Sequence, residues 1–376
     1  MRPSSGTGGG VGEGAPPTMS LDALSNRRRF LALSMGGVCA LAWSNSARAQ
    51  LAPTPVRRRA ATDEHSVTSA VRIEVRSRPI PSFDHRDRTQ LKFGALQYRS
   101  GVALTSPYPG FGGLSGIRLD DKGEQFLAIS DKGGWFMGRI AYSGREIAGL
   151  ADVEAAPLLG PDGRPITDRG WYDSECLARD GDIVYVGLER VNQLLRYDFA
   201  KGGIGARSEI VPLPPAAKRL PNNKGLEGLV VVPKGLPLAG TLIALSERGL
   251  DANGNLLAFL VGGPSPGQFS IVRSNDFDVS DAVLLPSGDL LVLERKFSLF
   301  TGVGVRIRRV KLADIAPGAL VDGPAIFSAD LGQEIDNLEG IDAHVTPDGE
   351  TVLTLVSDDN FSMIQRTLLL QFTMLE

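Results

Sequence analysis

Side chains that bind zinc or form disulfides are scarce in this sequence. Its 376 residues include two cysteines and three histidines. Cys39 lies in an N-terminal segment that we expect to be removed, so Cys176 has no partner for an internal disulfide. With so few thiols and imidazoles, a zinc site of the usual type is not expected. Any metal would be held by oxygen ligands, for which Ca²⁺ is the first choice and Mg²⁺ the second.

Strong charge of one sign and long apolar runs are also missing. Lys and Arg number 40 against 43 for Asp and Glu, and the formal net charge is −3. A chain so nearly balanced has no basic footprint for nucleic acid. No apolar stretch of the mature chain approaches the ~20 residues that a membrane-spanning helix needs. We therefore expect neither a nucleic-acid partner nor a transmembrane segment in the mature protein.

The N-terminus has the order of elements found in an export signal. Residues 1–18 are rich in Gly, Pro and Ser and are expected to be disordered, or to precede a true start at Met19. Residues 26–31 (NRRRFL) are followed by a short apolar run and then by Ala47-Arg48-Ala49. This order predicts a twin-arginine signal that ends at residue 49. We expect export by the Tat machinery and a periplasmic or secreted product, with an N-terminal membrane anchor as the alternative.

After a polar linker over residues 50–90, residues 91–376 are expected to form one domain built from a repeated unit. Each of five copies pairs a first apolar strand with a second strand that ends in a charged cluster. The first strands open with Ser115, Glu175, Glu227, Asp281 and Glu339, at steps of 60, 52, 54 and 58 residues. Self-similarity at this period, carried by short strands, predicts the blades of a β-propeller.

Turn residues and the two ends of the repeat array specify the fold further. Asp-Gly or Ser-Gly steps separate the two strands in four of the copies, and such steps supply the positive φ that a tight hairpin needs. The last copy lacks a fourth strand, whereas residues 91–98 form an unassigned strand before the first copy. An N-terminal strand that completes the last blade would leave no open sheet edge. We therefore predict an all-β propeller with four antiparallel strands per blade and five blades, with six as the alternative.

Equivalent residues of the repeats should converge near the axis, because the first strand of each propeller blade lines the central channel. Carboxylates crowded around one axis must hold protons, pair with cations or bind a metal. We predict catalytic roles for Glu175, Glu227 and Glu339. The predicted ligands of a Ca²⁺ site are Glu175, Glu227, Asp281, Glu339 and Asp358. The predicted substrate-binding cations are Lys132, Arg190, Arg248 and Arg295.

The charged strand ends also have a structural interpretation. The second strands end in Asp131-Lys132, Glu189-Arg190, Glu247-Arg248, Glu294-Arg295-Lys296 and Asp358. Acid–base pairs of this kind can tie neighbouring blades together at the rim of a propeller. A ring of acids that is fully neutralised by Arg and Lys would then be a scaffold and not a metal site.

Five motifs in order resemble one family of exported bacterial proteins. They are residues 112–116 (GGLSG), 223–227 (NKGLE), 293–299 (LERKFSL), 335–340 (IDNLEG) and 357–361 (SDDNF), with 365–369 (QRTLL) after them. In these segments the sequence resembles the phytase-like family, "esterase-like activity of phytase", over residues 91–374. The resemblance implies a propeller and favours ester or phosphoester hydrolysis. It implies no particular set of catalytic residues.

Three functions remain open at this point. The first is an exported hydrolase that acts on a small anionic substrate, a phosphate ester or related ester, with help from Ca²⁺. The second is a non-catalytic periplasmic propeller that binds a ligand or a protein. The third is a sugar-lactone hydrolase of similar architecture. Because propellers host both enzymes and binding proteins, the fold does not decide among them.

Overall fold

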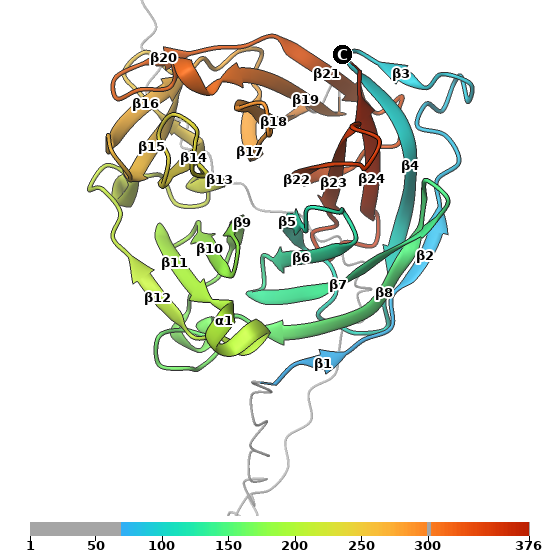
Figure 1. Cartoon of the computed structure of the whole chain (residues 1–376), viewed down its shortest axis with the longest axis horizontal. Coiled ribbons are helices and arrows are strands. Elements are labelled where there is room, and N and C mark those ends of the chain that lie inside the picture. Colours follow the sequence, from blue (N-terminus) through green and yellow to red (C-terminus); the bar gives the residue numbers. More distant parts are fainter. Residues whose placement is uncertain (1–68, 299–301, 376) are drawn as a thin grey trace, which may run out of the picture. The chain divides into compact units, whose positions relative to one another are not determined.

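The computed structural model describes residues 69–298 and 302–375. Within these ranges the chain is all-β, and its sheets form five blades around one axis (Figure 1). The predicted five-bladed propeller is therefore confirmed. The predicted export signal over residues 1–49 lies outside the described residues. No helix in the described ranges is long and apolar enough to cross a membrane.

The first four blades are antiparallel sheets whose first strand in the chain lies innermost (Figure 1). Blade 1 consists of β5 (Leu114–Leu119), β6 (Gln125–Ser130), β7 (Gly134–Ser143) and β8 (Glu146–Pro157). Blade 2 consists of β9 (Ser174–Asp180), β10 (Ile183–Leu188), β11 (Gln193–Asp198) and β12 (Ser208–Val211). Blade 3 consists of β13 (Leu226–Val231), β14 (Thr241–Leu250), β15 (Leu256–Gly262) and β16 (Gly267–Ile271). Blade 4 consists of β17 (Asp278–Leu284), β18 (Asp289–Ser298), β19 (Gly302–Lys311) and β21 (Ala325–Asp330).

Blade 5 joins the two ends of the described chain and closes the ring. It consists of β22 (Asn337–Val345), β23 (Thr351–Asp358), β24 (Thr367–Met374) and β4 (Leu96–Thr105). The N-terminal β4 pairs with β24 in antiparallel register over the length of that strand. The predicted closure is thus confirmed, although the closing strand begins at Leu96 and a short β3 (Lys92–Phe93) folds back on it.

Three short strands extend the blades at their outer edges. β1 (Val71–Arg72) pairs with β8, and β2 (Arg76–Pro79) pairs with β4. These two strands lie in the stretch that we expected to be a linker, and their Arg and Pro content also suits edge strands. β20 (Leu320–Val321) leaves blade 4 and pairs in parallel with β16 of blade 3. The edge pairings therefore connect segments that are distant in sequence.

Helical structure is confined to short turns. The described chain has one α-helical turn, α1 (Phe199–Gly202), and 3₁₀ turns at Ile166–Arg169, Gly203–Gly205, Ala217–Arg219 and Leu312–Asp314. The hairpins between first and second strands use the predicted glycines: φ is 59° at Gly181 and 85° at Gly349. Because this region of φ is open to glycine at little cost, the Asp-Gly steps fix these turns.

The core lies between neighbouring blades and holds the inner strands in place. Between blades 1 and 2, Trp135 and Tyr197 are fully buried, with ring centroids 5.1 Å apart and planes at 81°. Between blades 4 and 5, Phe327 and Phe372 pack in the same edge-to-face manner. Each such side chain contributes roughly 1.5–3 kcal/mol by burial. The packed blades therefore provide a rigid ring on which the strand ends near the axis are positioned.

Candidate functional site

A β-bulge interrupts the first strand of every blade near the residue at which it begins. In β9, Cys176 pairs with Gly187 and Ser174 pairs with Leu188, so Glu175 has no partner on β10. The same shift occurs in β5, β13, β17 and β22. A bulge leaves one residue outside the ladder and redirects its side chain. The five bulge residues are Ser115, Glu175, Glu227, Ser280 and Glu339.

The bulge in blade 4 corrects the predicted ring of acids. We expected Asp281 at this position, but Asp281 pairs with Leu293 in the ladder and Ser280 is the bulge residue. Asp281 was matched to the glutamates of the other blades because it is the nearest acid in the sequence. The equivalent position is instead set by the pairing of β17 with β18, which the sequence does not reveal. The ring therefore contains three carboxylates and two serines.

A second tier of charged residues follows the second strand of each blade. The residue before each bulge pairs with a residue at or next to the end of the ladder on the second strand: Ser130, Leu188, Ser246, Glu294 or Ser357. The residues that come next in the chain are Asp131, Glu189, Glu247, Arg295 and Asp358. Blade 4 again differs by one from the predicted alignment, because Arg295 and not Glu294 is in register with the acids. Glu294 is buried instead between Arg306 and Arg308, where it is fully paired.

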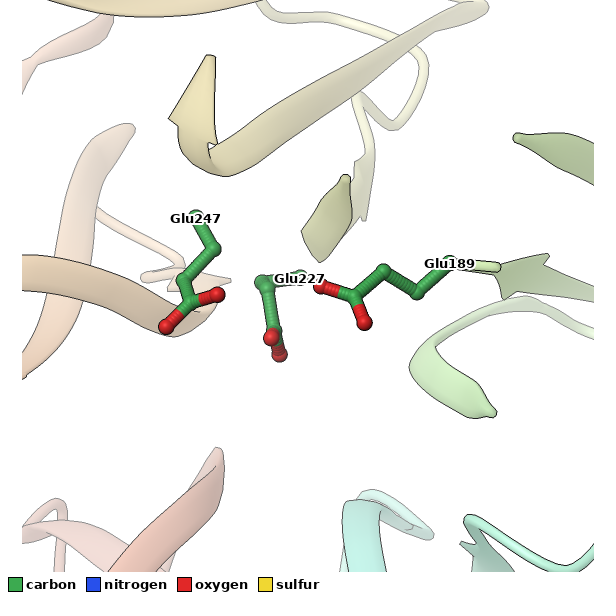
Figure 2. Close-up of side chains that lie close together, drawn as sticks. All are labelled: Glu189, Glu227 and Glu247. Carbon is green, nitrogen blue, oxygen red and sulfur yellow. The ribbon is translucent and has the colours of Figure 1, made fainter. Parts of the chain in front are cut away.

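Three glutamates of blades 2 and 3 lie close enough together to hold one cation (Figure 2). They are Glu189, Glu227 and Glu247, and one carboxylate oxygen of each lies within 4.8 Å of the others. All three side chains are buried, and Oε2 of Glu227 has no hydrogen-bond partner. Ca²⁺ binds oxygens at about 2.3–2.6 Å, so two ligands on opposite sides of it lie about 4.6–5.2 Å apart. The spacing of these oxygens therefore suits a hard cation.

The remaining acids gather around Asn337 in blade 5. Its amide donates hydrogen bonds to Glu339 Oε1 at 2.8 Å and to Asp358 Oδ2 at 3.4 Å. The charge of Glu339 acts on Glu175 and Asp131 as well. We call these residues, together with the three glutamates of Figure 2, the acidic cluster. Its seven carboxylates are Asp131, Glu175, Glu189, Glu227, Glu247, Glu339 and Asp358.

Two basic side chains form ion pairs with the acidic cluster. Arg295 lies 2.6 Å from Glu339 and 3.9 Å from Glu227. Lys224 donates to both oxygens of Glu247, at 2.8 and 2.6 Å. Arg295 was predicted to bind substrate, and the structure places it inside the cluster. Lys224 was not predicted, because it precedes its strand and has no counterpart in the other repeats.

The electrostatics of the cluster favour protons or a bound cation. Burial, followed by the charges of Glu339 and Glu189, raises the pKa of Glu175 well above its ordinary value. Burial and the charge of Glu247 raise the pKa of Glu189 to about 7. Burial and the charge of Glu339 raise the pKa of Asp358 to about 8. Among the described residues Arg295 and Lys224 form ion pairs with the seven acids, and Lys132 lies next to Asp131, so the ionised cluster has an uncompensated negative charge.

Asp281 belongs to a different arrangement farther along the axis. The guanidinium of Arg118 contacts both of its oxygens, at 3.1 and 3.2 Å. Arg118 also donates to carbonyls of four blades, those of Ile117, Leu229, Ala282 and Ile341. Both side chains are almost fully buried. We call Arg118 with Asp281 the axial pair; it lies on the axis where four blades meet, and both oxygens of Asp281 accept hydrogen bonds.

The other predicted substrate-binding cations lie outside the acidic cluster. Arg190 is paired with Asp173 at 2.9 Å, and Arg248 donates to Asp278 at 2.7 Å. Lys132 lies over the ring of Phe361 and has no ion-pair partner among the described residues. Of the five predicted ligands and acids, Glu175, Glu227, Glu339 and Asp358 lie in the cluster. Glu189 and Glu247 were visible as strand ends but were not chosen, although they are in register with Asp358.

Comparison with solved structures finds distant likenesses. A glutaminyl cyclase of Myxococcus xanthus is 12% identical, with a TM-score of 0.37, over 70% of this chain and 92% of that chain. The Pan2 WD40 domain of Neurospora crassa is 12% identical, with a TM-score of 0.36, over 76% of this chain and 97% of that chain. No curated protein matches the sequence significantly. The sequence profile of the family "Phytase-like: Esterase-like activity of phytase" matches residues 109–361, more than half of the chain.

Proposed function

The chain belongs to the phytase-like family, and from this membership and the acidic cluster we propose that it is an exported hydrolase of a phosphate ester or related ester, assisted by Ca²⁺. The observation that carries the proposal is the excess of acid at the end of the axis. Seven carboxylates converge there, and within residues 69–298 and 302–375 only Arg295 and Lys224 form ion pairs with them. A structural charge network would be neutralised, as the axial pair is. An uncompensated, buried cluster instead suits a site that takes up a cation.

The residues present fit a calcium ion by their chemistry. The donor set consists of carboxylate oxygens, which Ca²⁺ prefers, and Oε2 of Glu227 is a buried acceptor that lacks a donor. Glu189, Glu227 and Glu247 would hold the ion, with Asn337, Glu339 and Asp358 beside it. When bound, the ion would supply positive charge that polarises the ester oxygen.

Glu175 is the residue best placed to move a proton. It is half-buried, whereas Glu227 and Glu339 are buried, and no hydrogen bond or ion pair occupies its carboxylate among the described residues. A water oxygen would bond to phosphorus, or to the carbonyl carbon of another ester, while Glu175 takes the proton of the water. The bond to the leaving oxygen then breaks, and that oxygen receives the proton from Glu175.

Arg295 is the residue best placed to bind the anion of the substrate. Its guanidinium contacts Glu339 and approaches Glu227 and Glu247, and the side chain as a whole is 24% exposed, whereas Nε is buried and has no hydrogen-bond partner. Guanidinium groups bind the oxygens of phosphates and carboxylates through several donors at once. Arg295 would therefore hold the ester beside Glu175. Its positive charge would offset the repulsion between the anionic substrate and the carboxylates of the cluster.

A binding function is the second candidate, and Lys224 is the observation that favours it. This ammonium already holds both oxygens of Glu247, one of the three close glutamates. If Lys224 and protons together neutralise the cluster, the same face would bind a ligand without hydrolysing it. A sugar lactone remains a third candidate substrate, because it is a cyclic ester and would use the same groups.

A panel of phosphate esters, carboxylic esters and lactones tests the hydrolase directly. We expect Ca²⁺-dependent turnover of at least one class by the wild-type protein, with loss of two or more orders of magnitude in Glu175→Gln, the range of general base catalysis. Glu209→Gln, at an exposed ion pair on blade 2, is the matched control and should keep full activity. Turnover of no class, or equal activity in Glu175→Gln, would contradict the proposal and favour the binding function.

A further inference from the structure

Large apolar side chains that are exposed gather on the face that bears the acidic cluster. The loops between second and third strands, and those between blades, lie at this end of the axis, because first strands begin and second strands end there. Of the twelve large apolar residues that are exposed in the described chain, eight lie in these loops or the strand ends beside them. They are Tyr108, Tyr172, Val191, Leu250, Phe297, Leu331, Met363 and Ile364.

This apolar rim is distributed over the whole ring. Every blade, or the loop that enters it, contributes at least one of the eight residues. The opposite face exposes Leu91 and Val345, and the outer strands expose Ile210 and Leu320. Isolated apolar residues are common on protein surfaces, but a concentration around a polar centre marks an interaction site. The rim surrounds the proposed catalytic site, so both would meet the same ligand.

The most exposed residues of the rim are held by a firmly anchored loop. Met363 and Ile364 are 103% and 90% exposed, at the tip of the loop between β23 and β24. On one side, Asp359 accepts hydrogen bonds from the amides of Gly113 and Phe361, both at 3.0 Å. On the other side, Arg366 donates to Glu334 at 2.7 Å. The loop therefore presents two apolar side chains to solvent from a fixed base.

Basic residues directly follow the second tier of charged residues in the chain. The residue after each member of the second tier is Lys132, Arg190, Arg248, Lys296 or Asp359, so four of the five carry positive charge. Arg190 and Arg248 are paired with aspartates. Lys132 and Lys296 lie over the rings of Phe361 and Phe277 and form no ion pair within the described chain. Two ammonium groups that form no ion pair within the described chain thus accompany the exposed apolar side chains.

We propose that this face binds an anionic phospholipid surface. The substrate class of the hydrolase would then be a phosphate-bearing amphiphile. This assignment of substrate rests on the proposed function, because it takes the acidic cluster as the site that receives the head group. Protruding apolar side chains beside lysines are the pattern by which proteins enter the interface of a membrane. A surface that binds a protein partner usually has a contiguous apolar patch at its centre. Here single apolar tips alternate with cations, which suits acyl chains and phosphates.

Vesicle co-sedimentation of the full chain tests the proposal. Vesicles of equimolar phosphatidylcholine and phosphatidylglycerol should bind the wild-type protein in Ca²⁺, and more weakly in EDTA, where the ionised acidic cluster repels the anionic surface. Removing two apolar tips in Met363→Ser with Ile364→Ser should lower the partition coefficient roughly ten- to hundred-fold. The matched control, Leu91→Ser with Val345→Ser on the opposite face, should bind like the wild type. Equal loss in both double variants, or no binding by the wild-type protein, would overturn the proposal.

Further measurements separate this inference from its alternatives. Lys132→Gln with Lys296→Gln should weaken binding to the anionic vesicles by roughly fivefold per lysine, and not to vesicles of phosphatidylcholine alone. Self-association that is abolished by the Met363/Ile364 double variant would overturn the proposal in favour of a second copy of this chain. If the protein hydrolyses soluble esters but binds no vesicle, the membrane-binding inference is wrong and the proposed hydrolase stands. If the protein binds vesicles but hydrolyses no ester, the proposed hydrolase is wrong and the membrane-binding face stands.

Discussion

Two groups of charged residues share the axis of this propeller, and they differ in how far their charges are compensated. In the axial pair, one guanidinium meets one carboxylate at both oxygens and four carbonyl groups as well. In the acidic cluster, seven carboxylates meet two cations, and one glutamate oxygen is left without a donor. Both are buried. The difference indicates that burial of charge is structural where it is satisfied and functional where it is not.

The largest effect is expected from breaking the axial pair. Arg118→Met leaves Asp281 buried without its partner, so the free energy of unfolding should fall by about 3–5 kcal/mol. Arg179→Met, an exposed arginine one position further along the neighbouring first strand, should change it by less than about 0.5 kcal/mol. Chemical denaturation of both variants measures the difference. Equal stabilities would show that the axial pair contributes nothing specific.

The acidic cluster should make metal-free protein less stable as the pH rises. The pKa of Glu189 is raised to about 7 and that of Asp358 to about 8, by burial first and neighbouring acids second. Carboxyls with raised folded-state pKa values add stability that is fully present below their unfolded values, near pH 4, and is lost as the pH passes through the folded ones. In EDTA, the loss between pH 5 and pH 8 should be on the order of 6 kcal/mol, roughly 2–3 kcal/mol from Glu189 and roughly 3–4 kcal/mol from Asp358.

With saturating Ca²⁺, the dependence on pH should reverse, since the cation binds the ionised carboxylates. Thermal unfolding at a series of pH values, with and without the metal, records both slopes. Asp358→Asn should flatten the slope in EDTA. A metal-free protein that gains stability from pH 5 to pH 8 would show that the cluster is already neutralised by its cations.

Removing one charge from the cluster should stabilise the metal-free protein. Glu227→Gln takes away a buried carboxylate with an unpartnered oxygen, which should raise stability by about 1–2 kcal/mol and Tm by about 2–6 °C. Glu209→Gln, at an exposed ion pair, serves as the control and should leave Tm unchanged. Calorimetry in EDTA distinguishes them. A lower Tm in Glu227→Gln would mean that this glutamate is held by favourable contacts.

The smallest effect is expected at the exposed ion pair of Arg190 with Asp173. Arg190 is half-exposed and paired with Asp173, and exposed ion pairs of this kind contribute roughly 0–1 kcal/mol. Arg190→Ala should therefore change the free energy of unfolding by less than about 1 kcal/mol. It should also lower the rate of ester hydrolysis less than Arg295→Ala does. A loss of activity equal to that of Arg295→Ala would return Arg190 to the substrate-binding role that the sequence suggested.

The repeat pattern was sufficient to predict the propeller, the number of blades and the strand that closes the ring. It was not sufficient to align blade 4, because a bulge shifts the register by one residue and strand pairing is not visible in the sequence. Asp281 and Glu294 were therefore chosen where Ser280 and Arg295 belong. Arg118 had no signal at all, since it occurs in a single blade and stands in an ordinary apolar strand.

Calcium titration of EDTA-treated protein tests the central claim most directly. If the uncompensated acids form a cation site, isothermal titration calorimetry will show stoichiometric binding of Ca²⁺, and the metal will stabilise the protein by roughly 2.7 kcal/mol at a hundredfold excess over Kd. Glu227→Gln should lose both effects, and Glu209→Gln should keep them. Absence of binding by the wild-type protein, or undiminished binding by Glu227→Gln, would contradict the account and make the acidic cluster a protonated structural network.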